Sequence, residues 1–203
     1  VFTYTPEDQS QSCEESIVHP DLSATDNCSE AKVDNHIEDE RVDGNCPNQY
    51  RVIQRWVARD DCGNTANYSR RIHVYDRTAP HLIGVPEDTS APCFNIPEPA
   101  EVSARDNCDN YVRVEFREKL VDGSCKGTYT IVRSWVASDS CGNYDYAEQR
   151  IAVYDTFPPE FNEVPEDLRF ECDSVKLPAP PTARDSCSNV TITDQSYRQA
   201  GDC

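Results

Sequence analysis

The spacing of the cysteines repeats three times along the chain. A first cysteine is followed 15 residues later by a second one in every copy: Cys13 and Cys28, Cys93 and Cys108, Cys172 and Cys187. A third cysteine follows after 16 to 18 residues, at Cys46, Cys125 and Cys203, and a fourth 16 residues later, at Cys62 and Cys141. A cysteine pattern that recurs at a fixed interval indicates tandem structural units.

Other segments recur with the same period. The first cysteine of each copy is preceded by YTPED, GVPED or EVPED. The second cysteine is the last residue of ATDNC, ARDNC or ARDSC, and the fourth cysteine lies within WVARDDCGN or WVASDSCGN. The sequence therefore predicts two full units, residues 1–80 and 81–160, and the first half of a third, residues 161–203. These segments are called repeat 1, repeat 2 and repeat 3.

Cysteine usage points to an oxidising compartment. The chain has 11 cysteines among 203 residues, and no two of them have the C-x-x-C spacing of zinc or redox sites. Disulfides are the ordinary reason for so many cysteines, so we expect an extracellular or cell-surface protein. The chain contains no methionine, which we interpret as the mark of a processed chain or an internal segment.

The formal net charge of −18 disfavours nucleic acid and anionic membrane surfaces as partners, because like charges repel. No apolar run is long enough to cross a membrane, so we expect no membrane insertion. The motifs of serine hydrolases, zinc proteases and phosphate-binding loops are missing, and the four histidines do not cluster. We therefore expect no enzymatic activity.

The repeats have the alternating pattern of half-buried strands. In repeat 2 this pattern appears in YVRVEFREKL from Tyr111, TYTIVRSWVASD from Thr128 and EQRIAVYD from Glu148. Turns rich in Gly, Asn and Asp separate them. The sequence predicts an all-β fold of tandem, immunoglobulin-like antiparallel β-sandwiches stapled by disulfides, with Trp56 and Trp135 in the two cores.

The combined motifs resemble the hyalin-repeat (HYR) and HYR-like extracellular domains. The resemblance rests on P-E-D, A-x-D-N-C, Y-x-x-x-R-x-W-x-A-x-D-x-C-G-N and V-Y-D-x-x-x-P, and it covers both full repeats and the half repeat. It implies immunoglobulin-like domains in tandem that serve adhesion, spacing or assembly outside the cell, and it names no ligand. The cysteine within D-x-C-G-N departs from the animal form.

An immunoglobulin-like fold would place the A-x-D-N-C loop and the D-x-C-G-N turn at one end of each sandwich. That placement implies pairing within each repeat: Cys13 with Cys46, Cys28 with Cys62, Cys93 with Cys125, Cys108 with Cys141 and Cys172 with Cys203, leaving Cys187 unpaired. Four cysteines allow three connectivities, so two others stay open for each full repeat.

Several polar residues of the same motifs suggest a cation site. Chain continuity would bring Asp76, at the end of repeat 1, toward Asp106, Asp139 and Asn143 of repeat 2. Hard oxygen ligands that converge in this way suit calcium. The alternative interpretation is that these side chains only satisfy backbone groups through Asx turns.

Three N-x-S/T sequons are candidate glycosylation sites, at Asn67, Asn189 and Asn27. Asn27 precedes a cysteine that could hinder modification. Because short sequons also arise by chance, the sequence leaves open whether any of them carries a glycan.

We interpret the chain as a structural or adhesive segment of an extracellular repeat protein, such as a surface appendage, matrix or fibril. Repeat 3 has no counterpart of GTYTIVRSWVASDSCGN, so self-association into a head-to-tail filament is expected. The alternative is a ligand-binding module, for example for carbohydrate, of a larger secreted protein. The recurrence of tryptophan at equivalent positions favours the structural interpretation.

Overall fold

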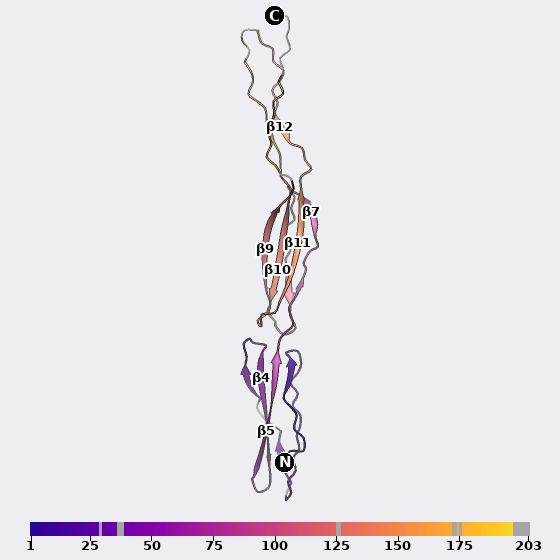
Figure 1. Cartoon of the computed structure of the whole chain (residues 1–203), viewed down its shortest axis with the longest axis vertical. Helices are drawn as coiled ribbons and strands as arrows, with labels where there is room; N and C mark the ends of the chain where they lie inside the picture. The colour runs from indigo at the N-terminus through magenta and orange to yellow at the C-terminus, as the bar shows by residue number, and fades with distance from the viewer. Residues whose placement is uncertain (29, 36–38, 125–126, 172–173, 175, 197–203) are drawn as a thin grey trace. The chain divides into compact units, whose positions relative to one another are not determined.

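The structure, a computed structural model, describes residues 1–28, 30–35, 39–124, 127–171, 174 and 176–196. Over these residues its regular elements are 13 β-strands (Figure 1). None of the described residues belongs to a helix with the length and apolar character needed to cross a membrane.

The chain forms two compact units. The first comprises Val1–Val85, Glu101–Phe116 and Trp135–Ala147, and the second Pro86–Ala100, Arg117–Ser134 and Glu148–Cys203. Strands β9 (Arg113–Asp122), β10 (Tyr129–Ser138) and β11 (Tyr144–Tyr154) contribute residues to both units.

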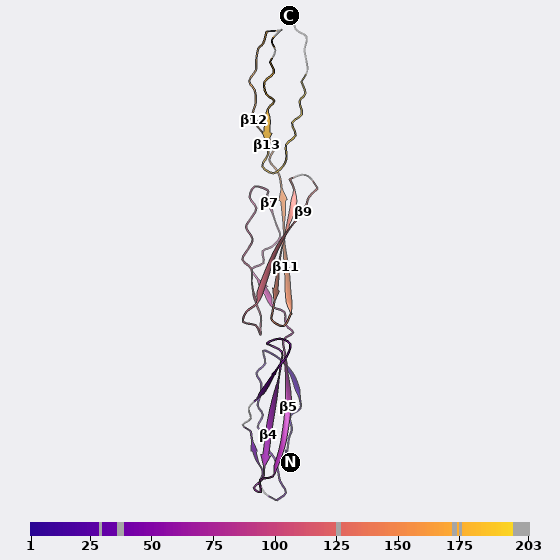
Figure 2. The same ribbon diagram turned by 90° about the vertical axis from the view of Figure 1, so that its left-hand side faces the viewer.

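The largest sheet in the first unit is built on the hairpin of β4 (Tyr50–Arg59) and β5 (Thr65–Tyr75) (Figure 2). Alternate side chains of β4 are buried, which is the two-residue period expected of a strand with one face in the core. β2 (Lys32–Asp34) and β3 (Glu40–Asp43) pair antiparallel with β4, whereas β1 (Gln9–Ser12) pairs parallel with β5.

The first unit also contains a small second sheet, formed by β6 (His81–Ile83) and β8 (Ser103–Arg105). Leu82 and Ala104 of this sheet belong to one apolar cluster with Trp135 and Ala137 of β10. Trp135 is 2% exposed and Trp56, in β4, is 3% exposed, so both tryptophans are core residues as predicted. The sheet of β6 and β8 therefore shares a core with β10, which pairs with β9 and β11 in another sheet, and two sheets that share a core in this way form a sandwich.

In the second unit, β7 (Thr89–Pro92) pairs parallel with β11. Ala91, Ile131, Ile151 and Val153 form its buried apolar cluster. β12 (Glu160–Glu163) pairs antiparallel with β13 (Thr182–Arg184). The all-β class of tandem immunoglobulin-like sandwiches with disulfide staples is confirmed, with parallel first strands as an addition to the predicted antiparallel sheets.

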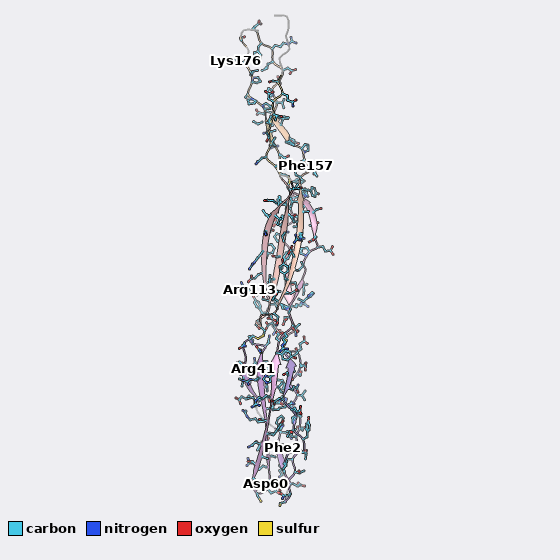
Figure 3. The ribbon with its side chains drawn as sticks, viewed as in Figure 1. Phe2, Arg41, Asp60, Arg113, Phe157 and Lys176 are labelled. Atoms are coloured by element: carbon cyan, nitrogen blue, oxygen red, sulfur yellow. A yellow bond between two sulfur atoms is a disulfide. The ribbon has the colours of Figure 1, made fainter. Side chains whose placement is uncertain are left out.

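The cysteines of repeat 1 lie at opposite ends of its sheet. Cys13 follows β1 and Cys46 precedes β4, so both lie at the end where β5 finishes. Cys62 lies in the turn between β4 and β5, at the other end. In Figure 3 the label Arg41 lies near the end that holds Cys13 and Cys46, and the label Asp60 marks the end that holds Cys62. We call these two ends the trailing end (Cys13 and Cys46) and the leading end (Cys28 and Cys62).

Candidate functional site

Two disulfides join the trailing end of repeat 1 to the leading end of repeat 2. Cys13 is bonded to Cys108, with their Cα atoms 5.9 Å apart, and Cys46 to Cys141, with their Cα atoms 5.1 Å apart. Both separations lie in the normal range for disulfides. We call this region, which also contains the Asp76–Pro80 connection, the joint.

The predicted pairing within repeats is therefore wrong. Cys13 does not pair with Cys46, nor Cys108 with Cys141, because each bonds a cysteine of the neighbouring repeat. Among the described residues, Cys13 and Cys46 share one end of the sheet and Cys62 lies at the other, as predicted, but the end of one repeat lies closer to the next repeat than was assumed. The predicted Cys28–Cys62 bond is also not formed, since both are exposed free cysteines.

The second unit contains the same kind of bond. Cys93 is bonded to Cys187 of repeat 3, with their Cα atoms 5.8 Å apart. This corrects two further predictions, the pairing of Cys93 with Cys125 and the unpaired state of Cys187. Cys125, Cys172 and Cys203 lie outside the described residues, and so does the predicted bond between the last two.

Three carboxylates meet beside the first disulfide of the joint. One ligand oxygen from each of Asp76, Asp106 and Asp139 lies within 4.8 Å of the other two. Asp76 directly follows β5, Asp106 follows β8, and Asp139 follows β10, so strand ends fix all three. We call this group the acidic joint site.

Each aspartate uses one oxygen to hold its own loop. Asp76 Oδ1 accepts a hydrogen bond from the Thr78 N–H at 3.2 Å, and Asp106 Oδ1 accepts one from the Cys108 N–H at 2.8 Å. Asp139 Oδ1 accepts from the N–H of Cys141 at 2.9 Å. These are Asx-type turns, as the alternative interpretation of the sequence expected.

The second oxygens of Asp76 and Asp106 have no such function. Both Oδ2 atoms are buried and accept no hydrogen bond from the described residues. A buried polar atom without a partner is costly and requires an explanation, such as a bound ion. Asx turns and a cation site are therefore compatible, because they use different oxygens of the same carboxylates.

The electrostatics of the site favour a cation. Burial raises the pKa of Asp76 above its ordinary value of 3.8, although the Thr78 N–H opposes the shift, and the negative charges of Asp106, Asp139 and Asp109 raise it further. Asp76 is only 8% exposed, so solvent screens this repulsion little. A bound cation would neutralise the repulsion.

Asn143 supports the site through its amide nitrogen. Its Nδ2 donates to Asp139 Oδ2 at 2.6 Å and to the carbonyl oxygen of Asp76 at 3.4 Å. The turn that holds it contains Gly142 at φ 90°, a conformation that residues with a Cβ rarely adopt. Asn143 thus lies where it was predicted, but as a donor that positions Asp139.

Sequence reasoning missed a hydrogen-bond cluster beside the joint. Asp109 Oδ1 accepts from Asn48 Nδ2 at 2.6 Å, which links the two repeats, and from Ser140 Oγ at 3.0 Å. Asp109 Oδ2 accepts from the Ser140 N–H at 2.5 Å. The counterparts of Asp109 are Ser29 and Ser188, so the repeat pattern carries no signal for it.

The donor set consists of hard ligands. The sulfurs of Cys13 and Cys108 lie close to Asp76, but their disulfide removes the thiolates that zinc would use. Carboxylate oxygens remain, and these suit calcium or magnesium. The three sequon asparagines, Asn27, Asn67 and Asn189, are all exposed.

No protein-family model matches the chain, and neither does any curated protein. Solved structures with limited likeness include Drosophila N-cadherin EC1-4 (14% identity, TM-score 0.32, 80% of this chain and 52% of that one) and a protocadherin gammaB7 EC3-6 cis-dimer (12%, 0.31, 80% and 49%). The human desmocollin-1 ectodomain is 10% identical, with TM-score 0.29, over 57% of this chain and 29% of that one. The chain spans about half of the first two structures or less. Likenesses of this size assign neither a family nor a ligand.

Proposed function

We propose that the chain is a structural segment of an extracellular repeat array, in which each repeat is fastened to the next by disulfides and by calcium. One observation carries the proposal: Cys13–Cys108 and Cys46–Cys141 both cross the same joint. Two covalent bridges in addition to the peptide connection restrict bending and rotation far more than a single connection does.

Calcium would complete the joint. Asp76 and Asp106 would hold it through their unpartnered Oδ2 atoms, and Asp139 would be the third ligand. The ion supplies positive charge that offsets the repulsion of buried carboxylates. It would therefore stabilise the assembled joint relative to the separated repeats.

The wider setting follows from the cysteines and the motifs. Disulfides between repeats persist in an oxidising environment, which supports an extracellular or cell-surface location. The resemblance to HYR-like domains supports a role in adhesion or in a fibril that grows by head-to-tail self-association. The exposed sequons at Asn27, Asn67 and Asn189 are proposed glycan sites.

The first test is a disulfide map of the full chain produced by secretion. Thiols are blocked, the protein is digested without reduction, and linked peptides are identified by mass spectrometry. We expect Cys13 linked to Cys108 and Cys46 linked to Cys141. Linkage of Cys13 to Cys46 would overturn the proposed joint.

The second test measures calcium binding by titration calorimetry and by thermal unfolding with calcium or chelator. Binding to the folded state should raise Tm, and Asp76→Asn should abolish the increase. Asp43→Asn is the matched control, because Asp43 has a side chain that is 81% exposed and pairs with Arg41. If wild type and Asp76→Asn respond equally to calcium, the acidic joint site is not the binding site.

A further inference from the structure

The leading end of repeat 1 has the same construction as the leading end of repeat 2. The Cys28 N–H donates to Asp26 Oδ1 at 2.9 Å, just as the Cys108 N–H donates to Asp106 Oδ1 at 2.8 Å. Repeat 1 therefore holds Cys28 in the same Asx turn that presents Cys108 to a cysteine of the preceding repeat.

The second turn of this end is also reproduced. Asn64 donates from its backbone N–H to Asp60 Oδ1 at 2.8 Å and from its Nδ2 to Asp60 Oδ2 at 2.7 Å. Asn143 makes the same two bonds to Asp139, at 2.8 Å and 2.6 Å. The glycines of the two turns, Gly63 and Gly142, have φ of 86° and 90°. Cys62 therefore has the backbone setting of Cys141.

The leading end of repeat 1 contains a hollow. At the leading end of repeat 2, Asp76 of the preceding repeat occupies the equivalent place. Asp26, Asp60 and Asn64 are among the residues that line this hollow. Their counterparts Asp106, Asp139 and Asn143 surround Asp76, which enters from the preceding repeat. Cys28 and Cys62, beside the hollow, are both exposed and free, whereas Cys108 and Cys141 are bonded.

We propose that Cys28 and Cys62 form a two-point attachment site for another repeat of this same kind. Cys28 bonds the first cysteine of the incoming repeat, Cys62 bonds its third cysteine, and its V-Y-D aspartate enters the hollow. The inference rests on the proposed function, because it extends the observed joint to a second position. It adds the partner of this end and the register of both bonds.

The chemistry of attachment is ordinary thiol–disulfide exchange. For each bond, two thiols lose two protons and two electrons and become joined through sulfur. The electrons and protons reduce one small-molecule disulfide, such as oxidised glutathione, to two thiols. Two bonds consume two such disulfides.

The test is a disulfide map of the protein as its own cells secrete it, with free thiols blocked before isolation. We expect Cys28 linked to a first-position cysteine and Cys62 linked to a third-position cysteine. The mass of the unreduced protein shows whether the incoming repeat belongs to the same polypeptide or to a second copy. Blocked thiols at Cys28 and Cys62, a Cys28–Cys62 bond or the reverse register would each overturn the inference.

The same map separates this inference from the proposed function. If Cys13–Cys108 and Cys46–Cys141 are found while Cys28 and Cys62 are blocked thiols, the joint stands and only the attachment site fails. If the first two bonds are missing, the proposed function itself fails. Incubating the purified full chain with oxidised glutathione adds a control, because Cys28→Ser with Cys62→Ser should lose disulfide-linked dimers while keeping the wild-type Tm.

Discussion

Arg70 on β5 donates through Nε to Oε1 of Gln54 on β4, at 2.8 Å, and both side chains are buried. Arg70 also donates to the carbonyl oxygen of Val18 at 2.6 Å. Repeat 2 exchanges the two residue types: Arg133 lies on β10, Gln149 on β11, and Arg133 donates to the carbonyl oxygen of Pro97 at 2.8 Å. The arginine that donates to the loop carbonyl can thus come from either strand of the hairpin, from β5 in repeat 1 and from β10 in repeat 2.

This exchange predicts the result of a swap. Arg70→Gln should destabilise the protein by about 1–3 kcal/mol, because it leaves buried acceptors without their donor. Gln54→Arg combined with Arg70→Gln places the two residue types as in repeat 2, where the arginine on the equivalent strand donates to the loop carbonyl, and should recover most of the loss. Urea unfolding measures both. A double variant that is less stable than Arg70→Gln would contradict the equivalence of the two strands.

The joint should respond to pH in opposite ways at two aspartates. The pKa of Asp76 is raised mainly by burial, so in chelator its contribution to stability is present below about pH 3.8 and is lost as the pH rises through its raised value. Urea unfolding in chelator should therefore show the free energy of unfolding of wild type falling, relative to Asp76→Asn, as the pH rises from 3.8. A constant difference would contradict this assignment.

The pKa of Asp109 is shifted in the opposite direction, so its effect on stability has the opposite pH dependence. Burial opposes its ionisation, but hydrogen bonds from the backbone and hydroxyl of Ser140 and from Asn48 outweigh burial and lower its pKa. Its contribution is present above pH 3.8 and is lost as the pH falls through the lowered value. Unfolding of Asp109→Asn, compared with wild type in the same pH series, should show a loss of stability that shrinks in acid.

The Asn48–Asp109 hydrogen bond should couple the two repeats energetically. A double-mutant cycle of Asn48→Ala and Asp109→Ala should give a coupling free energy of about 0.5–1.5 kcal/mol, the usual net value of one hydrogen bond. The pair Asn48→Ala and Asp60→Ala is the control, because Asp60 lies in the turn between β4 and β5, at the opposite end of repeat 1 from Asn48. Coupling near zero for Asn48 and Asp109 would show that the bond adds no stability.

Gly142→Ala should lower the stability of the protein more than Gly63→Ala does, although both replace a glycine with positive φ in the same kind of turn. Each substitution strains the backbone by about 1 kcal/mol. The turn around Gly63 can relax because Cys62 is free, whereas Cys141 is bonded to Cys46. Thermal unfolding measures the difference, and equal losses would show that the bridge does not restrain its turn.

The sequence predicted the strands and the meeting of Asp76, Asp106 and Asp139, because strand alternation and chain continuity depend only on local order. It did not predict the disulfide partners. Spacing shows which cysteines share an end of a sheet, but not how closely the ends of two repeats approach. That approach depends on contacts such as Asn48 with Asp109, which has no repeated counterpart. The sequence also did not predict that Arg70 and Arg133 are buried, because polarity patterns place charged side chains on the surface.

The parallel pairing of β1 with β5 determines how the joint carries a mechanical load. Ser12 lies opposite Tyr75, so Cys13 and Asp76 leave the sheet side by side, and Cys46 leaves it at the start of the adjoining β4. Tension across the joint is therefore divided among three neighbouring strands rather than pulling on β5 alone. A reductant that opens both disulfides leaves β5 as the only covalent connection across the joint, so thiol chemistry in the surroundings controls how many covalent links share the load.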